Sequence, residues 1–436
     1  MGAEVPLTRR AIRLAQGEAL RSLLTAIVPG NTFQTRRLAA VRKDLMSMTS
    51  LEEFVRLVPL TTKTELVDDQ AVTPPYGTNL TFPLARYTRC HQTSGTSGVP
   101  LRWLDTPESW NALVDVWTGV HRAAGVTAED RIFFAFSFGP FIGFWLAFEA
   151  GQRLGALCLP GGGLSSPSRL HAILDHQATV LCCTPTYALH LAETSSMEGL
   201  SLARSRVRTI IVAGEPGGSI PTTRRRIEEV WSGARVFDHH GMTEVGPVTY
   251  ECPAEPGVLH IAELAFLAEV IDPATTRPVR PGERGELVLT TLHRTGSPLL
   301  RFRTGDLVRP RQLPEDEGAP CCACGQASLA LEGGILGRVD DMLIVRGVNL
   351  YPGAVEAILR GFSDIAEYQV VVTQPEGLTD VTVRIEPVQD YADPAGLARR
   401  VAAAFQVALA LRLRVIPVPA GGLPRFEFKA QRWLRR

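Results

Sequence analysis

Residues 131–136, Arg-Ile-Phe-Phe-Ala-Phe, form the short apolar run from which the fold class is predicted. Similar runs follow at 178–183 and 209–213, and the nearby segments 167–176 and 222–230 have the spacing of amphipathic helices. Short buried strands that alternate with helices are typical of a parallel sheet covered by helices. The sequence therefore predicts an α/β fold.

The segments on either side of this core have other patterns. The first 75 residues indicate helices, among them 51–58 and 64–69, and Thr61 or Thr62 is placed to cap the second. After Gly257, the strand-like runs 263–272 and 285–291 are not separated by long helices. This pattern favours an antiparallel or barrel-like subdomain.

The C-terminal hundred residues have an α+β pattern. We expect helices at 354–359 and 394–411 and strands at 369–373 and 380–385. The predicted organisation is a large N-terminal domain (1–336) of helix-covered mixed sheets plus a barrel-like subdomain, a hinge (337–341), and a small, mobile lid domain (342–436).

Composition limits the partners and the compartment. The chain has 436 residues, with 45 basic and 45 acidic side chains, and this balance argues against nucleic acid as a partner. The most apolar run, 133–146, is interrupted by Ser137, Gly139 and Pro140, so we expect no membrane span. The N-terminus has no secretory pattern, and we expect a cytoplasmic protein. A homodimer is left open.

A segment rich in glycine and hydroxyl residues lies at 93–98. Glycines let the backbone approach a ligand closely, and the backbone amides and hydroxyls can surround a phosphate. Such clusters are also common in ordinary turns. The candidate phosphate-binding residues are Thr93, Ser94, Gly95, Thr96, Ser97 and Gly98.

Together with four later motifs, this loop resembles the adenylate-forming superfamily, and within it the phenylacetate-CoA ligase family. Residues 238–244 resemble its Asp-x-Tyr-Gly-x-Thr/Ser-Glu motif, with His240 at the tyrosine position. Residues 301–306 resemble its Arg-Tyr-Arg-Thr-Gly-Asp motif, 337–349 its hinge region, and 424–430 its terminal Pro-Arg-x-x-x-Lys-Ala motif. The resemblance extends over nearly the whole chain, from Pro59 to Lys429.

The resemblance implies an ATP site. Glu244 would hold Mg²⁺ and Thr243 would contact the α-phosphate, although a Thr-Glu pair can also cap a helix. Asp306 would accept hydrogen bonds from the ribose hydroxyls, and Arg338 would reach the phosphate or the ribose. The expected adenine-binding residues are Gly214, Glu215, Pro216, Asp238, His239, His240, Gly241 and Met242.

The same resemblance assigns roles in the lid. Lys429 would be the catalytic lysine, bridging the acid oxygen and the α-phosphate, and the alternative is a solvated lysine near a basic terminus. Asp340 would be the pivot of a lid rotation between adenylation and thioester formation. Gly347 would line the coenzyme A channel.

The acid pocket is expected beside two segments, 136–144 and 184–187. Flat aromatic walls separated by small residues suit a substrate that carries a ring. The alternative is that these aromatic side chains belong to the core. The candidate substrate-binding residues are Ser137, Phe138, Gly139, Phe141, Gly143, Thr184, Pro185 and Tyr187.

Cysteines suggest a metal site in the second subdomain. Cys252, His260, Cys322 and Cys324 make a ligand set that suits tetrahedral Zn²⁺, and Cys321 is an alternative to Cys322. The family resemblance also implies a Cys-x-Cys-Gly element at this place. Reduced free thiols are the alternative, because a cytoplasmic protein is not expected to form disulfides.

The predicted function is that of an AMP-forming ligase. It would activate an aromatic carboxylic acid, either benzoate- or anthranilate-like or phenylacetate-like, with ATP, and would then transfer the acyl group to coenzyme A. One alternative is an adenylation enzyme that loads an aryl acid onto the phosphopantetheine thiol of an acyl carrier protein. Another is a nucleotide-binding module without catalysis.

Overall fold

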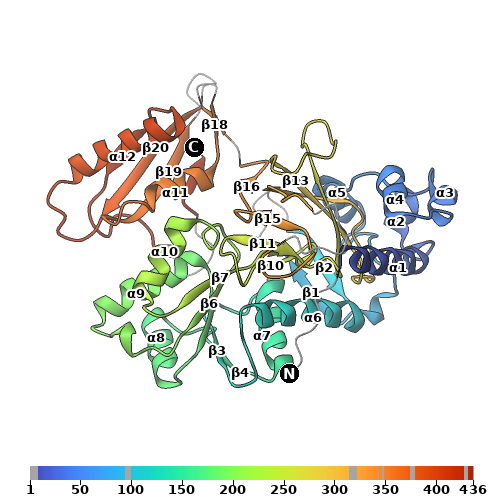
Figure 1. Cartoon of the computed structure of the whole chain (residues 1–436), viewed down its shortest axis with the longest axis horizontal. Coiled ribbons are helices and arrows are strands. Elements are labelled where there is room, and N and C mark those ends of the chain that lie inside the picture. The colour runs from blue at the N-terminus through green and yellow to red at the C-terminus, as the bar shows by residue number, and fades with distance from the viewer. Residues whose placement is uncertain are drawn as a thin grey trace. The chain divides into compact units, whose positions relative to one another are not determined.

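The computed structural model describes residues 8–93, 100–313, 322–341, 343–345, 348–373, 379–426 and 431–435. Contacts divide the chain into two compact units (Figure 1), Met1–Gly163 with Phe237–Ile335 and Leu164–Val236 with Leu336–Arg436. One division, between residues 335 and 336, adjoins the expected hinge at 337–341. The predicted domain boundaries themselves stay a prediction.

Helices form the N-terminal part of the first unit, as predicted. Thr62 is the residue that caps α5: its hydroxyl accepts a hydrogen bond from the Glu65 amide, and the Glu65 carboxylate accepts one from the Thr62 amide. This reciprocal capping box satisfies two amides that would otherwise have no partner. The helices of this unit are α1 (Arg9–Ile27), α2 (Thr32–Arg37), α3 (Arg42–Met46), α4 (Leu51–Leu57), α5 (Lys63–Val72), α6 (Pro107–Ala123) and α7 (Ile142–Leu154).

Parallel strand pairs confirm the α/β prediction. In the first unit, β3 (Arg131–Phe134) pairs in parallel with β4 (Leu157–Pro160), and α7 connects them. In the second unit, β5 (Val180–Cys183) pairs in parallel with β6 (Thr209–Val212). The helices of this second region are α8 (Ser166–Asp175), α9 (Pro185–Met197) and α10 (Pro221–Val230), and β7 (Arg235–Asp238) follows them.

Antiparallel sheets make up the rest of the first unit, as the run of strands without helices predicts. β12, β13 and β14 pair in sequence order, and β11 pairs with both β10 and β15. Leu259, Leu287 and Phe302 from these sheets share one buried core. The strands are β1 (Arg89–Gln92), β2 (Arg102–Asp105), β8 (Gly241–Met242), β9 (Gly246–Pro247), β10 (Thr249–Glu251), β11 (Val258–Ile261), β12 (Phe266–Ile271), β13 (Gly285–Thr291), β14 (Phe302–Val308) and β15 (Ala330–Glu332).

The C-terminal segment has the predicted α+β composition. β19 and β20 pair antiparallel, with β21 added in parallel beside β20 and β22 beside β19. Val370, Val383 and Phe405 lie in its buried core. The elements are β16 (Gly337–Arg338), β17 (Leu343–Val345), β18 (Val348–Leu350), α11 (Pro352–Leu359), β19 (Ile365–Thr373), β20 (Asp380–Pro387), α12 (Pro394–Leu409), β21 (Arg414–Pro417) and β22 (Trp433–Arg435).

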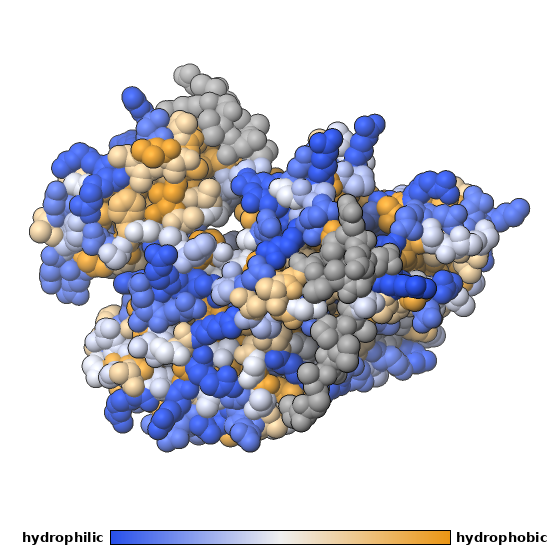
Figure 2. All heavy atoms as spheres, in the orientation of Figure 1, coloured by the Kyte–Doolittle hydropathy of each residue, from blue (hydrophilic) through white to orange (hydrophobic). Residues whose placement is uncertain are grey.

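The surface is mainly polar. Hydrophilic side chains cover most of the face drawn in Figure 2. The large apolar side chains that are most exposed, Val72, Met197 and Val407, come from different elements. Within the described residues, every helix is either too short or too polar to cross a lipid bilayer.

Candidate active site

The motif 238–244 forms a hairpin in the first unit. β7 ends at Asp238, and β8 and β9 then pair antiparallel, with residues 243–245 as their turn. Gly246 closes the turn at φ +91°, a conformation that side chains with a Cβ rarely adopt. The alternative that Thr243 and Glu244 cap a helix is therefore wrong, since they connect two strands.

The carboxylate of Glu244 is buried and paired with a cation. Its side chain is 3% exposed, and its Oε1 lies 3.2 Å from the Nζ of Lys63, the first residue of α5. A carboxylate has two oxygens and further acceptor positions besides the one that faces the ammonium, which suits a ligand of Mg²⁺. Lys63 is absent from the site residues that the motifs predict, although it lies near the start of the family resemblance.

The two motif histidines have different surroundings. His239 packs its ring 4.4 Å from that of Trp117, and its Nδ1 lies 2.6 Å from the Thr249 carbonyl oxygen. Burial lowers the pKa of His239 to about 3, so the imidazole is neutral. The His239 ring thus packs in the core, and the predicted place of this residue beside the adenine stays a prediction.

His240 lies beside the carboxylate predicted to bind ribose. Its Nε2 is 3.0 Å from Oδ2 of Asp306, which is nearly buried on β14. The structure therefore brings together two predicted nucleotide-binding residues that are far apart in sequence. Their neighbours are also placed: the Asp238 amide donates to Glu251, and Gly241 and Met242 are half-buried on β8.

The predicted phosphate loop joins two paired strands. β1 and β2 are antiparallel, and residues 93–101 connect them. Thr93 is buried, and its hydroxyl accepts a hydrogen bond of 3.0 Å from the Leu101 amide. The other residues of this prediction, Ser94, Gly95, Thr96, Ser97 and Gly98, lie outside the described residues.

The predicted acid-pocket residues of the first unit lie in an aromatic cluster between β3 and α7. Phe138 is half-buried, and its ring meets those of Trp145 and Phe148 edge to face, at 5.1 and 5.4 Å. Phe136 stacks on Phe144 at 4.2 Å. The remaining predicted residues of this segment are Ser137, which is half-buried, Gly139, whose carbonyl accepts from Trp145, and Phe141 and Gly143, which are exposed.

Two predicted segments of the second unit are joined to each other. The Thr186 amide donates a hydrogen bond of 2.8 Å to the carboxylate of Glu215. Of the other predicted residues in these two segments, Thr184 is half-exposed, and Gly214 and Pro216 are exposed. Pro185 starts α9 and is buried. Tyr187 is fully buried with its hydroxyl 2.9 Å from Ser166, so core packing accounts for this side chain.

The lid residues are only partly described. Arg338 lies on β16, and its Nε is 3.4 Å from Asp340, which is exposed. Lys429 and Gly347, the predicted catalytic and channel residues, lie outside the described residues.

The predicted metal ligands converge. The ligand atoms of Cys252, His260, Cys322 and Cys324 all lie within 4.8 Å of one another. Cys252 and Cys322 have their sulfurs 3.2 Å apart, and Cys324 lies 3.3 Å from Nε2 of His260. The other imidazole nitrogen, Nδ1, faces the Ser328 carbonyl at 3.3 Å, an arrangement that presents Nε2 as a ligand. Cys321, the alternative ligand, lies outside the described residues.

Known proteins resemble the chain over almost its whole length. Residues 92–293 match the model for the AMP-binding enzyme family, and 347–435 match that for the AMP-binding enzyme C-terminal domain. A phenylacetate-coenzyme A ligase of Thermus thermophilus is 31% identical over 97% of this chain and 95% of the relative. One from Escherichia coli is 30% identical over 89% of this chain and 86% of the relative.

Solved structures extend this similarity. A 2-hydroxyisobutyryl-CoA ligase in the postadenylation state, in complex with 2-HIB-AMP, has a TM-score of 0.90 at 27% identity, over 99% of this chain and 91% of that one. The sequence motifs and these relatives indicate the same family. The chain belongs to the phenylacetate-CoA ligase family of adenylate-forming enzymes and is an AMP-forming acid–CoA ligase.

Proposed function

We propose that this enzyme activates an aromatic carboxylic acid with ATP and transfers the acyl group to coenzyme A. The observation that carries the aromatic choice is the cluster around Phe138, where edge-to-face and stacked rings flank a half-exposed segment interrupted by small residues. Flat apolar walls of this kind favour a planar ring, because aromatic pairs gain energy beyond the area they bury. Benzoate-, anthranilate- and phenylacetate-like acids share this ring.

The chemistry has two balanced steps. A carboxylate oxygen of the acid attacks the α-phosphorus of ATP, and the bond to the leaving pyrophosphate breaks. The sulfur of coenzyme A then attacks the acyl carbon, and the bond to AMP breaks as the thioester forms. Both steps build negative charge on phosphate oxygens, so fixed donors and cations lower the barriers.

The predicted nucleotide-binding and catalytic residues would have separate roles in this scheme. Residues 93–98 would donate to the phosphates, and Thr243 would contact the α-phosphate. Glu244 would hold Mg²⁺, which neutralises charge on the triphosphate. Asp306 would accept from the ribose, Arg338 would reach the phosphate or the ribose, and Lys429 would bridge the acid and the α-phosphate. Gly214, Glu215, Pro216 and the segment 238–242, apart from the buried His239 ring, would surround the adenine.

The two steps place different demands on the lid. We propose that residues 342–436 carry Lys429 into place for adenylation and rotate about Asp340 for thioester formation, with Gly347 then lining the thiol path. The exposed side chain of Asp340 supports this pivot, because it can turn with the chain without breaking core contacts.

We also propose that Zn²⁺ is held by Cys252, His260, Cys322 and Cys324. The convergence of four soft or borderline ligands, with a carbonyl behind the imidazole, supports this closed set. The ion would join the loop after β10 to the loop before β15. Such a site stabilises the fold and has no open position for substrate.

An acid panel tests the function. Purified enzyme is offered ATP, Mg²⁺ and benzoate, anthranilate, phenylacetate or aliphatic 2-hydroxyisobutyrate, and acid-dependent pyrophosphate exchange is measured. We expect exchange with at least one ring-bearing acid at a kcat/KM at least about tenfold above the aliphatic one, which corresponds to about 1.4 kcal/mol. A preference for the aliphatic acid would refute the aromatic assignment.

Two further measurements test the thiol acceptor and the acid pocket. Coenzyme A and a phosphopantetheinylated carrier protein are offered separately after adenylation, and thioester on the carrier alone would refute coenzyme A as the acceptor. Phe138→Ala should lower kcat/KM for the ring-bearing acid, while Leu157→Ala, an exposed side chain on β4, serves as the matched control.

A further inference from the structure

We propose that the buried ion pair of Arg294 and Asp105 is a positioning device for the Mg²⁺-nucleotide site. It holds the backbone of Thr243 and Glu244 in the geometry that the phosphates need. The inference rests on the proposed role of these two residues in binding ATP. No sequence motif points to either member of the pair.

The contacts are specific and almost fully buried. The side chains of Arg294 and Asp105 are 1% and 0% exposed, and two hydrogen bonds of 2.7 and 2.6 Å join the guanidinium to the carboxylate. The third nitrogen, Nη1, donates to the carbonyl oxygens of Thr243 and Glu244 at 2.8 and 2.9 Å. One planar cation therefore fixes two consecutive peptide groups of the motif.

The pair also connects the motif to the strand that follows the phosphate loop. Asp105 is the last residue of β2, and residues 93–101 lead into that strand. The segment that carries Arg294 is held to the same region, since the Gly296 amide donates to Ser109 and the Ser297 hydroxyl donates to the Leu104 carbonyl. The ion pair thereby joins the turn predicted to bind Mg²⁺ to the end of β2.

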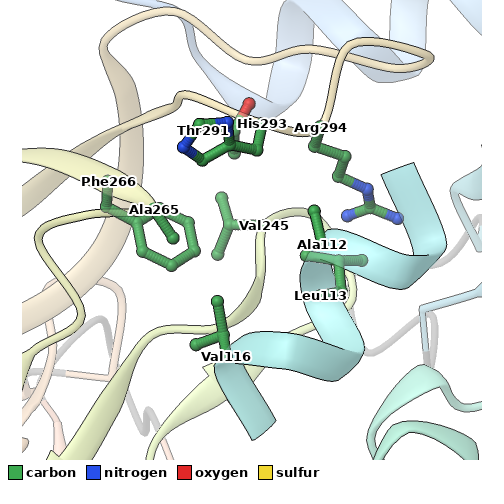
Figure 3. A pocket seen from close by; sticks show the side chains of 9 residues that line it. All are labelled: Ala112, Leu113, Val116, Val245, Ala265, Phe266, Thr291, His293 and Arg294. Carbon is green, nitrogen blue, oxygen red and sulfur yellow. The ribbon is translucent and has the colours of Figure 1, made fainter. Parts of the chain in front are cut away.

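Stability alone does not account for this arrangement. Removing two charges from water costs about as much as their attraction returns, and apolar side chains of similar volume often replace a buried pair without loss. A fork-shaped donor set gives fixed orientation instead, which an apolar pair cannot supply. Figure 3 shows the Arg294 side chain next to Ala112 and Leu113 of α6, so apolar side chains border an arginine whose guanidinium is held by Asp105 and two carbonyl oxygens.

The test separates position from stability. The double variant Arg294→Met/Asp105→Leu removes both charges together. Because it also leaves the Thr243 and Glu244 carbonyl oxygens without this donor, we expect its urea midpoint to fall, by no more than that of Leu20→Ala, while the KM for MgATP in pyrophosphate exchange rises at least about tenfold and the Mg²⁺ requirement shifts upward. Leu20→Ala, a core change in α1, should lower the midpoint and leave both kinetic values unchanged.

Amide hydrogen exchange across residues 241–246 gives a second, activity-independent readout. Faster exchange in the double variant supports the proposal; unchanged exchange together with unchanged KM overturns it. If the double variant does not fold, Arg294→Lys, which keeps the charge but loses the fork, is measured in the same two ways. Absence of pyrophosphate exchange in the parent with every acid would refute the proposed function, while hydrogen exchange would still decide the positioning role.

Discussion

Gly246 offers a quantitative test of how the Thr243–Glu244 turn is built. Its φ is +91°, and a Cβ there would lie 2.6 Å from Cδ2 of Leu113 on α6. Gly246→Ala therefore adds the left-handed backbone cost, about 1–2 kcal/mol, to an overlap cost of about 1–3 kcal/mol. Leu113 borders a cavity of only about 10 Å³, enough for one water at most, so it has little room to move away.

A matched glycine isolates the overlap. Gly282 has a similar φ of +82° and open space where its Cβ would lie. Both substitutions reduce the entropy of the unfolded chain equally, so that effect cancels in the comparison. We expect urea unfolding to show Gly246→Ala losing about 1–3 kcal/mol more than Gly282→Ala.

A double-mutant cycle identifies the partner. Leu113→Ala alone should cost about 2–5 kcal/mol, but in that background Gly246→Ala should cost little more than Gly282→Ala. Pyrophosphate exchange by Gly246→Ala should fall as well, because the strain lies beside Glu244. Equal costs for the two glycine substitutions, with no coupling to Leu113, would refute this account of the turn.

Three further predictions concern the lid lysine, the metal and the buried histidines. Lys429→Ala should abolish acid-dependent pyrophosphate exchange but largely spare thioester formation from preformed adenylate, and equal losses in the two assays would contradict the lid role. Metal analysis should find about one zinc per chain in the parent, and none in Cys322→Ser/Cys324→Ser, whose melting temperature should fall. A parent that holds no zinc and melts at the same temperature as this double variant would exclude the site. Burial lowers the pKa of His121 to about 4 and that of His239 to about 3, below the value near 6.5 of an unfolded chain, so protons bind the unfolded state preferentially. The free energy of unfolding should therefore be highest above pH 6.5 as far as these histidines are concerned, and it should fall as the pH drops toward 4, by up to about 1.4 kcal/mol per pH unit for each histidine. His121→Gln should reduce this dependence on pH, and an unaltered slope would contradict the prediction.

Local signals explain what was predictable from sequence. The apolar run at 131–136 and the spacing at 167–176 correspond to β3 and α8 within two residues at each end. Thr62 and Glu65 form the capping box because both partners lie within one helical turn. Patterns of this kind depend on neighbours in the chain, so a sequence displays them directly.

The contacts that shape the site come from distant segments. Lys63 meets Glu244, and Asp105 meets Arg294 across 189 residues of chain. Neither pair has a local pattern, since an arginine in a loop and an aspartate at a strand end are both common on surfaces. Contacts between distant segments turn them into site residues, and such contacts depend on the assembled fold.

His239 and His240 show the same limit between neighbours. The first packs against Trp117 and the second faces Asp306, and nothing in their order tells which imidazole turns inward. The position of His240 beside Asp306 matters because the family motif has a tyrosine where this chain has His240. The approach of His240 Nε2 to Asp306 Oδ2, at 3.0 Å, is an electrostatic contact, and an ionised carboxylate offers about four acceptor positions. Two ribose hydroxyls need only two of them. A histidine in the tyrosine position is therefore compatible with the ribose contact that we propose for Asp306.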